Sequence, residues 1–301
     1  MSGSLAPGLK VPYGLTGALV VLLVVVSAGG AVGAGWLYRD NPLISATFSG
    51  QDWITLLVAV PLLIVGLVLE RRGCRRGRLL WIAAVFYTMY SYLFYAVGAA
   101  FNVFFLLYVA IFGIAAYILL LVVPRIDVTS LAAAVGGRAA RAMAIGYMLM
   151  VGVGLGLLWT GMSLSYLFTG VVPAPIVASG HPTGVVFAID LVFIVPPMLI
   201  GAIGLIRRQA AGWILAAVMS VSGTVYTLSL AAASISVARA GVGLAAELPI
   251  WAILTLLGVT TSCLLFLRIP GRRRPPSPPT PGLLVLFSSR HPGEERPQGH
   301  R

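Results

Sequence analysis

Long apolar segments recur along the whole chain, and most of the charged residues stand in the short connections between them. A helix needs about 20 mostly apolar residues to cross a bilayer, and eight segments meet that requirement. They are residues 13–37, 53–70, 79–98, 103–123, 142–166, 185–206, 212–236 and 249–268. Their apolar residues surround the helix and do not alternate as the strands of a membrane barrel do. The pattern predicts an all-α, polytopic membrane protein with eight transmembrane helices.

Composition agrees with this prediction. The chain has 301 residues, of which 59% are hydrophobic and 9% charged, and its mean hydropathy is +1.00. Soluble domains carry about 25% charged residues, so we expect residues 1–269 to form one helical bundle whose main partner is the lipid bilayer. Residues 270–301 are rich in Pro and Arg. We expect them to form an extended, disordered tail, whose role the sequence does not assign.

The basic residues predict an orientation. Eighteen of the 20 Lys and Arg residues lie at the N-terminus, in the even-numbered connections or after the last span, and only Arg39 and Arg239 lie in odd-numbered connections. Because cytoplasmic loops are enriched in Lys and Arg, both termini are predicted to be cytoplasmic. This rule accounts for the net charge of +12, so we predict no nucleic-acid partner.

The first segment has a second interpretation. Its apolar core from Leu15 to Val26, followed by small residues 31–34, has the order of a secretory signal peptide. The apolar run continues to Trp36, and the repeat described next requires the segment, so we expect it to remain as the first span.

Two halves of the chain share a pattern. Pro61 stands ten residues before Arg71, and Pro197 stands ten residues before Arg207. A tryptophan opens the segment after each basic connection. Such a repeat across four helices predicts two four-helix halves in one orientation, with a two-fold axis along the membrane normal. The alternative is a chance match between apolar sequences.

A few polar residues inside or beside the spans are the candidates for chemistry. Asp190 is the one acid well inside a predicted span, and Asp52 is placed at nearly the same predicted depth on the outer side. Acids within a membrane mark ion or substrate sites, so we predict an outward-side, ligand-binding pocket formed by Asp52, Asp190, Tyr90, Tyr95 and Asn102. The alternative is that the acids cap helix N-termini, which the position of Asp52 directly before Trp53 fits well.

Three function hypotheses follow. The first is a small-solute or ion permease that binds its solute or cation through Asp190. The second is a non-catalytic scaffold, whose glycine pairs Gly29/Gly33 and Gly152/Gly156 pack against a partner helix. The third is an intramembrane enzyme using both aspartates. The sequence has no phosphate loop, no paired-Cys or His-Glu-x-x-His metal site and no Gly-x-Ser-x-Gly turn. We therefore predict no cofactor and no metal, and the enzyme hypothesis is the least favoured.

Several short motifs also resemble a known group. They are Gly50-Gln51-Asp52, Tyr90 with Tyr92, Phe101-Asn102 followed by Phe105-Leu106 and Tyr108-Val109, and Asp190-Leu191 with Phe193 and Pro196. Over residues 36–235 the chain resembles a group of uncharacterised bacterial multi-pass inner-membrane proteins. The resemblance implies a bacterial plasma membrane location and brings no activity with it. The Pro-rich tail is not part of the pattern.

Overall fold

The computed structural model describes residues 9–129 and 137–268, where the regular structure is helical and includes no strand. Within these residues eight helical spans are long and apolar enough to cross a membrane, which confirms the predicted fold class. The elements are α1 (Lys10–Leu37), α2 (Pro42–Ile54), the π-helix η1 (Thr55–Ala59), α3 (Val60–Arg71), α4 (Arg75–Gly98), α5 (Phe105–Val122), the 3-10 turn η2 (Val123–Arg125), α7 (Arg138–Thr169), α8 (Ala174–Ser179), α9 (Val185–Phe193), α10 (Val195–Ile206), α11 (Ala210–Arg239) and α12 (Leu248–Arg268). The predicted tail, 270–301, lies outside the described residues, as do the first eight residues of the signal-peptide alternative.

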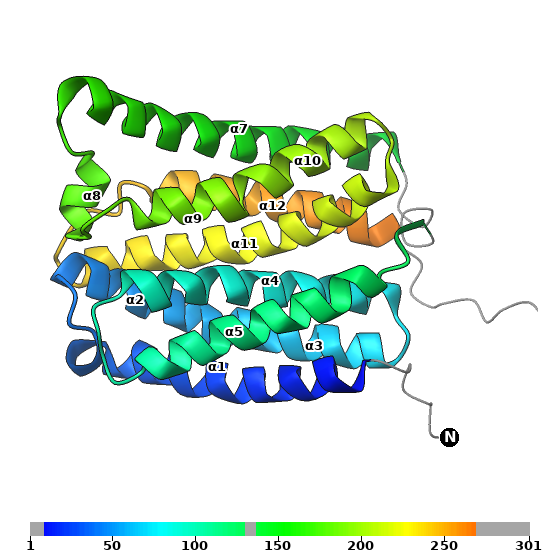
Figure 1. The fold of residues 1–301 in the computed structure, drawn as a ribbon, viewed down its shortest axis with the longest axis horizontal. Coiled ribbons are helices and arrows are strands. Elements are labelled where there is room, and N and C mark those ends of the chain that lie inside the picture. Colours follow the sequence, from blue (N-terminus) through cyan, green and yellow to red (C-terminus); the bar gives the residue numbers. More distant parts are fainter. Residues whose placement is uncertain (1–8, 130–136, 269–301) are drawn as a thin grey trace, which may run out of the picture.

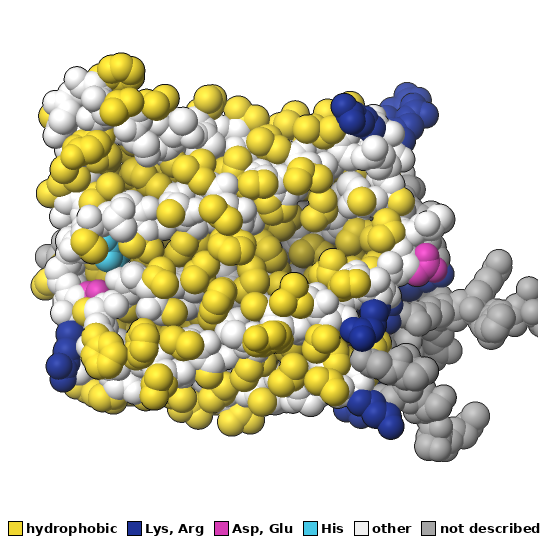
Figure 2. All heavy atoms as spheres, viewed as in Figure 1, with side chains coloured by type: hydrophobic (Ala, Val, Ile, Leu, Met, Phe, Trp, Pro, Cys, Tyr) yellow, Lys and Arg dark blue, Asp and Glu magenta, His cyan; other side chains and the backbone are white. Residues whose placement is uncertain are grey.

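The spans lie side by side in one bundle (Figure 1). α1 begins and α12 ends at the same end of the bundle, as an even number of crossings requires. We call the opposite end, where α1 ends and α2 begins, the outer end, after the predicted orientation. Hydrophobic side chains cover the visible face between the two ends, and most of the visible Lys and Arg side chains gather at the end where α1 begins (Figure 2).

The centre of the bundle is formed by α4 and α11, which contact each other and are the most buried of the eight spans. α2 packs against α11, and α9 packs against α4. α4 carries Tyr, Ser and Thr among its buried residues, and α11 carries Ser and Thr. Hydroxyl groups need partners in an apolar interior, so this central interface is where interhelical hydrogen bonds are expected.

The second span of each half is interrupted. A π-helix separates α2 from α3 just before Pro61, and a break at Ile194 separates α9 from α10 just before Pro196. Proline has no N–H and its ring clashes with the preceding turn, so it frees a carbonyl and bends a helix. The second span of each half is therefore interrupted just before a proline.

Neighbour relations are also alike in the two halves. The first span packs against the second and fourth, and the third packs against the same two, in α1–α5 and again in α7–α12. This is the arrangement that a parallel repeat requires, and the repeat itself stays a prediction.

The glycine pairs assigned to a partner helix face neighbours within this chain. A Cβ atom at Gly29 would meet the ring of Phe104 on the α4–α5 connection, and one at Gly33 would meet Trp36 on its own helix. In the second half, a Cβ atom at Gly152 would meet the Met198 side chain, and one at Gly156 would lie 3.4 Å from the Val195 side chain. The glycines thus permit close packing inside the bundle.

Candidate functional site

Asp52 lies inside a helix, and the interpretation of this residue as a helix cap is wrong. α2 begins at Pro42, eleven residues earlier than the predicted start of the second span, because Asn41 caps it by accepting a hydrogen bond from the Ile44 N–H at 2.9 Å. At 1.5 Å per residue, Asp52 lies about 15 Å along the helix from that start. It is fully buried.

Two tyrosines hold the Asp52 carboxylate. The hydroxyl of Tyr38, which follows α1, donates a hydrogen bond to Oδ2, and the hydroxyl of Tyr95 on α4 donates to Oδ1 at 3.1 Å. Burial, with the Asp52 charge second, raises the pKa of Tyr38 well above its usual value, so this hydroxyl stays a donor at neutral pH. Gly30 on α1 lies directly against both groups, since a methyl at this position would overlap the Asp52 Oδ2 and Tyr38 hydroxyl oxygens.

Aromatic rings surround this carboxylate. Phe48 packs on Tyr95 with ring centroids 4.6 Å apart and on Tyr38 at 5.0 Å. On the other side Tyr92 stacks against Tyr95 at 5.2 Å, and its own hydroxyl is buried without a hydrogen-bond partner. Tyr92 therefore contributes packing to the Asp52 environment and no hydrogen bond.

Asp190 occupies a similar environment in the second half. It is 3% exposed and lies in α9, one turn before the break at Ile194. The Tyr90 hydroxyl donates to its Oδ1 at 2.5 Å, and the Trp159 indole N–H, from α7, donates to Oδ2 at 2.8 Å. Trp159 is fixed by stacking on Phe187, whose ring centroid lies 4.2 Å away.

A third polar group lies about one turn from Asp52 along the second span and about one turn from Tyr90 along α4. The hydroxyl of Tyr87 on α4 is within hydrogen-bond distance of Thr55 Oγ1, at 3.0 Å, and of Ser229 Oγ on α11, at 3.3 Å. Thr55 opens the π-helix, and π-helical turns are frequent at functional sites. The group joins the interrupted second span to both central helices.

The predicted pocket residues are thus distributed over separate places. The structure brings Asp52 together with Tyr95, and Asp190 together with Tyr90. Asn102 instead lies in the turn before α5, where its side chain accepts a hydrogen bond from the Phe104 N–H at 2.9 Å. It lines a cavity of about 410 Å³ at the α4–α5 connection, together with Arg39, Phe101, Val103, Phe105 and Leu106.

Sequence reasoning missed Tyr38, Trp159, Thr55 and Ser229 as site residues; it expected Tyr87 on a helix face that points into the bundle and did not assign it to the pocket. The available signal was that a buried acid needs donors from other spans, and Trp159 and Tyr38 are such donors near the ends of predicted spans. Which donor reaches which acid depends on helix rotation and depth, and the apolar pattern does not specify these.

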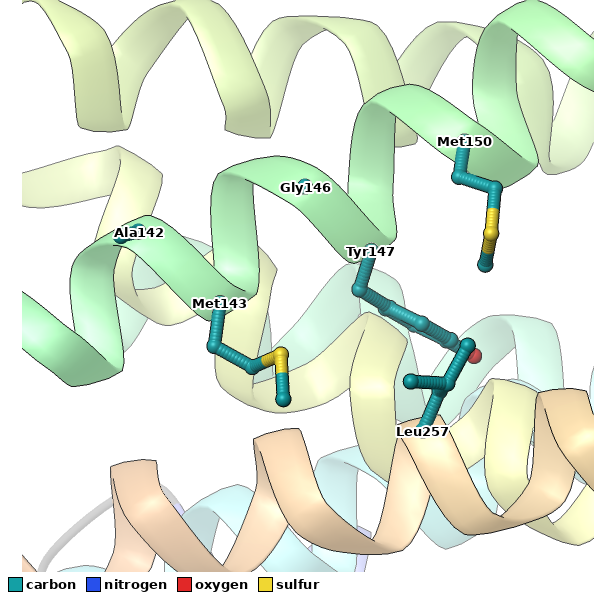
Figure 3. A pocket seen from close by; sticks show the side chains of 6 residues that line it. All are labelled: Ala142, Met143, Gly146, Tyr147, Met150 and Leu257. Atoms are coloured by element: carbon teal, nitrogen blue, oxygen red, sulfur yellow. The ribbon is translucent and has the colours of Figure 1, made fainter.

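A second cavity, of about 380 Å³, opens between α7 and α12 (Figure 3). It is lined by Ala142, Met143, Gly146, Tyr147, Met150 and Leu257. The Tyr147 hydroxyl is its one polar side-chain group, and no lining residue is charged. The cavity suits an apolar occupant and offers no ligand for an ion.

Within the described ranges no three His, Cys, Asp or Glu side chains gather as a metal site. Asp52 and Asp190 are buried carboxylates whose hydrogen-bond donors are aromatic side chains. Comparisons of the chain with protein-family models, curated proteins and solved structures find no match.

Proposed function

We propose that the protein is a proton-linked permease: a membrane protein that moves protons, alone or together with a small solute or cation. The observation that carries this proposal is the position of Asp52 and Asp190. Each is a buried acid on an interrupted span, one in each half, and each accepts hydrogen bonds from uncharged Tyr or Trp donors. Interrupted helices with buried polar groups are a frequent construction of transporter binding sites.

The packing around the carboxylates favours a proton over a larger ligand. Gly30 contacts the Asp52 carboxylate so closely that one methyl group would not fit, and Phe48, Tyr38 and Tyr95 fill the remaining sides. A proton needs no cavity beyond the hydrogen bond it forms. In this conformation both carboxylates are closed to water, so transport requires a second conformation in which at least one of them opens.

The energies allow both protonation states. An ionised Asp at the centre of a membrane helix costs about 2.5–3.5 kcal/mol on insertion scales. Hydrogen bonds to charged groups contribute about 1.5–3 kcal/mol each, so two such bonds offset the cost of the ionised form. The neutral form costs less free energy to place in lipid, but its hydrogen bonds to the Tyr and Trp donors are weaker. Because the terms are close, each carboxylate can bind and release a proton.

The other two hypotheses have less support. A paired-aspartate enzyme needs two carboxyl groups that share a proton, whereas both oxygens of each aspartate bond to Tyr or Trp. A scaffold acting through its glycine faces would need them free, and they are packed within the chain. The bacterial plasma membrane location with cytoplasmic termini belongs to the proposal and rests on the charge distribution.

The direct test is proton flux in proteoliposomes under an imposed pH gradient, read with a trapped pH-sensitive dye. We expect the wild-type protein to collapse the gradient at least about ten times faster than empty vesicles. Asp190→Asn and Asp52→Asn should each return the rate to near that of empty vesicles, because an amide does not exchange a proton at this pH. Glu247→Gln, an exposed acid-to-amide change, is the control and should keep the wild-type rate. Wild-type vesicles that leak no faster than empty ones would contradict the proposal.

Gly30 provides a second test that leaves both carboxylates in place. We expect Gly30→Ala to separate Tyr38 from Asp52 and to lower proton flux at least about fivefold, because the methyl group displaces two flexible side-chain ends. Gly35→Ala, on the same helix with open space around it, is the matched control. Equal flux in the two folded variants would show that the Tyr38–Asp52 contact is not part of the mechanism.

A further inference from the structure

The cavity between α7 and α12 is a recess in the side of the bundle that faces the bilayer. Ala142, Gly146 and Met150 line it at intervals of four residues along α7, and all three are exposed on the bundle surface. The Met143 and Met150 side chains extend from α7 toward α12 (Figure 3). Methionine is flexible and packs against irregular apolar groups, so this wall adapts to an apolar chain.

Tyr147 closes the cavity toward the bundle centre. A Cβ atom at Gly223 on α11 would lie 2.5 Å from the Tyr147 hydroxyl oxygen, and one at Gly258 on α12 would lie 3.3 Å from it. The ring thus extends across to both helices, and Tyr147 is only 3% exposed. An occupant of the cavity therefore enters from the bilayer, and the apolar lining favours hydrocarbon.

Two arginines stand beside the cavity at the end of the bundle where α1 begins, which we call the inner end. Arg138 opens α7 one turn before Ala142, on the same side of the helix, and Arg141 directly precedes Ala142. Neither arginine forms an ion pair with another described residue. The acids within α7–α12 and their connections are Asp190 and Glu247, and both lie toward the outer end. The inner end of the cavity is therefore positively charged, which is complementary to an anionic group.

The depths of the arginines and of the cavity match the dimensions of a phospholipid. A bilayer is about 40–45 Å thick with its headgroups and about 30 Å without them, which leaves about 5–7.5 Å for each headgroup layer. Arg138 precedes Ala142 by four residues, or about 6 Å of helix. A phosphate group bound to Arg138 therefore places its acyl chains at the depth where the cavity begins. The lining from Ala142 to Met150 covers about 12 Å more, within one leaflet of about 15 Å.

We propose that the cavity and the two arginines form a binding site for one anionic phospholipid of the inner-end leaflet. An acyl chain fills the apolar cavity, and Arg138 and Arg141 bind the headgroup phosphate. Arginine suits this role because its planar guanidinium group donates two parallel hydrogen bonds to a phosphate. Basic sites between membrane helices bind anionic headgroups in the same way. The site shares no residue with the environments of Asp52 and Asp190, so it goes beyond the proposed function and does not depend on it.

A second copy of the chain is the other apolar occupant available in a membrane. Two copies that met through this cavity around an axis along the membrane normal would bring their Arg138 and Arg141 side chains together. Within α7–α12 no acid at the inner end would compensate these charges. Like charges oppose such a contact, whereas an anionic lipid neutralises them.

The test uses the full-length protein in phosphatidylcholine bilayers that contain a small fraction of phosphatidylglycerol with a photoactivatable diazirine in one acyl chain. Mass spectrometry of the labelled peptides locates the lipid, and we expect the label on residues 142–150 and on the part of α12 around Leu257. Phosphatidylcholine with the same diazirine should label these residues at least about fivefold less, because it carries no net charge to bind the arginines.

The headgroup contact is tested by replacing both arginines, Arg138→Gln with Arg141→Gln. We expect labelling of the cavity by the phosphatidylglycerol probe to fall at least about fivefold, because both contacts to the phosphate are lost. The matched control is Arg72→Gln with Arg75→Gln, which removes the same charge at the connection between α3 and α4 and should leave the labelling unchanged.

The cavity is tested separately by Gly146→Leu, which keeps both arginines. A Cβ atom at Gly146 has nothing within 4 Å, so the leucine extends into the cavity without a clash. We expect labelling to fall at least about fivefold, because a filled cavity excludes the acyl chain. Gly161→Leu, at another open glycine of α7 outside the cavity, is the matched control and should keep the wild-type labelling.

Three results would overturn the lipid site. They are equal labelling by the anionic and neutral probes, equal labelling of Gly146→Leu and the wild-type protein, and cross-links between two copies through the cavity-lining residues. The last result would assign the cavity to a second copy of the chain. Proton flux enters none of these measurements, so a protein that moves no protons would overturn the proposed function and leave the lipid site to be decided by the labelling.

Discussion

Replacing Arg78 by alanine is expected to destabilise the protein by about 3–5 kcal/mol, because it leaves a buried carboxylate without its partner. Arg78 bonds to Oε1 of Glu70 through Nε at 3.0 Å and through its terminal nitrogen at 2.5 Å. Both residues are buried at the connection between α3 and α4, and Oε2 of Glu70 has no partner of its own. The free energy of unfolding of the purified protein, measured by denaturant titration in detergent micelles, gives the loss.

The comparison that isolates the ion pair is a variant in which both partners are replaced by apolar residues of similar size, Glu70→Leu with Arg78→Met. Such replacements are often neutral or stabilising because they remove the cost of burying the charges. We expect the double variant to be at least about 2 kcal/mol more stable than Arg78→Ala. If Arg78→Ala is as stable as the double variant, water reaches the Glu70 carboxylate in the Arg78→Ala protein.

The second large effect is expected at Gly50, two residues before Asp52, where α2 meets α11. A Cβ atom there would lie 2.6 Å from the Ala232 carbonyl oxygen and 2.6 Å from the Ala233 Cα. Backbone atoms cannot rotate away as a side-chain end can, so α2 and α11 must separate. Overpacking of this kind costs about 1–3 kcal/mol, and we expect Gly50→Ala to lie at the upper end of that range in the same titration.

The control for Gly50 is Gly161→Ala, another helical glycine with open space around it. Alanine loses less conformational freedom than glycine when a helix forms, so Gly161→Ala should be as stable as the wild-type protein or slightly more so. Since Gly50 also positions the helix that carries Asp52, its variant should lower proton flux as well. If the two variants are equally stable, the contact between α2 and α11 is looser than the structure has it.

The number and order of the spans could be predicted because a continuous apolar run of sufficient length has few alternatives in lipid. The start of the second span could not. Residues 42–52 contain Ser45, Thr47, Gln51 and Asp52, and an apolar count therefore begins the span after them. In the bundle this segment packs against α11. Ser45 and Thr47 donate to nearby backbone carbonyls, and Asp52 accepts from two tyrosines, so these polar groups are satisfied within the protein.

For the candidate site, the sequence predicted two aspartates and three supporting residues in one outward pocket. The structure pairs Asp52 with Tyr95 and Asp190 with Tyr90, and places Asn102 in the turn before α5. Asp190 draws its partners from α4 and α7, 100 and 31 residues away in the chain. Pairings at such separations depend on which helices are neighbours. The spacing of residues along the chain does not predict which helices are neighbours.

The sequence by itself determined that this chain is a bundle of eight membrane helices with two acids in apolar surroundings, because hydropathy and charge act locally, span by span. Only the tertiary structure decided that α4 and α11 occupy the centre, that each acid receives two aromatic donors, and that the Tyr87 hydroxyl meets Thr55 and Ser229. The physical reason is that hydrogen bonds between helices form according to relative rotation and depth. Those quantities are fixed by close packing of all eight spans together.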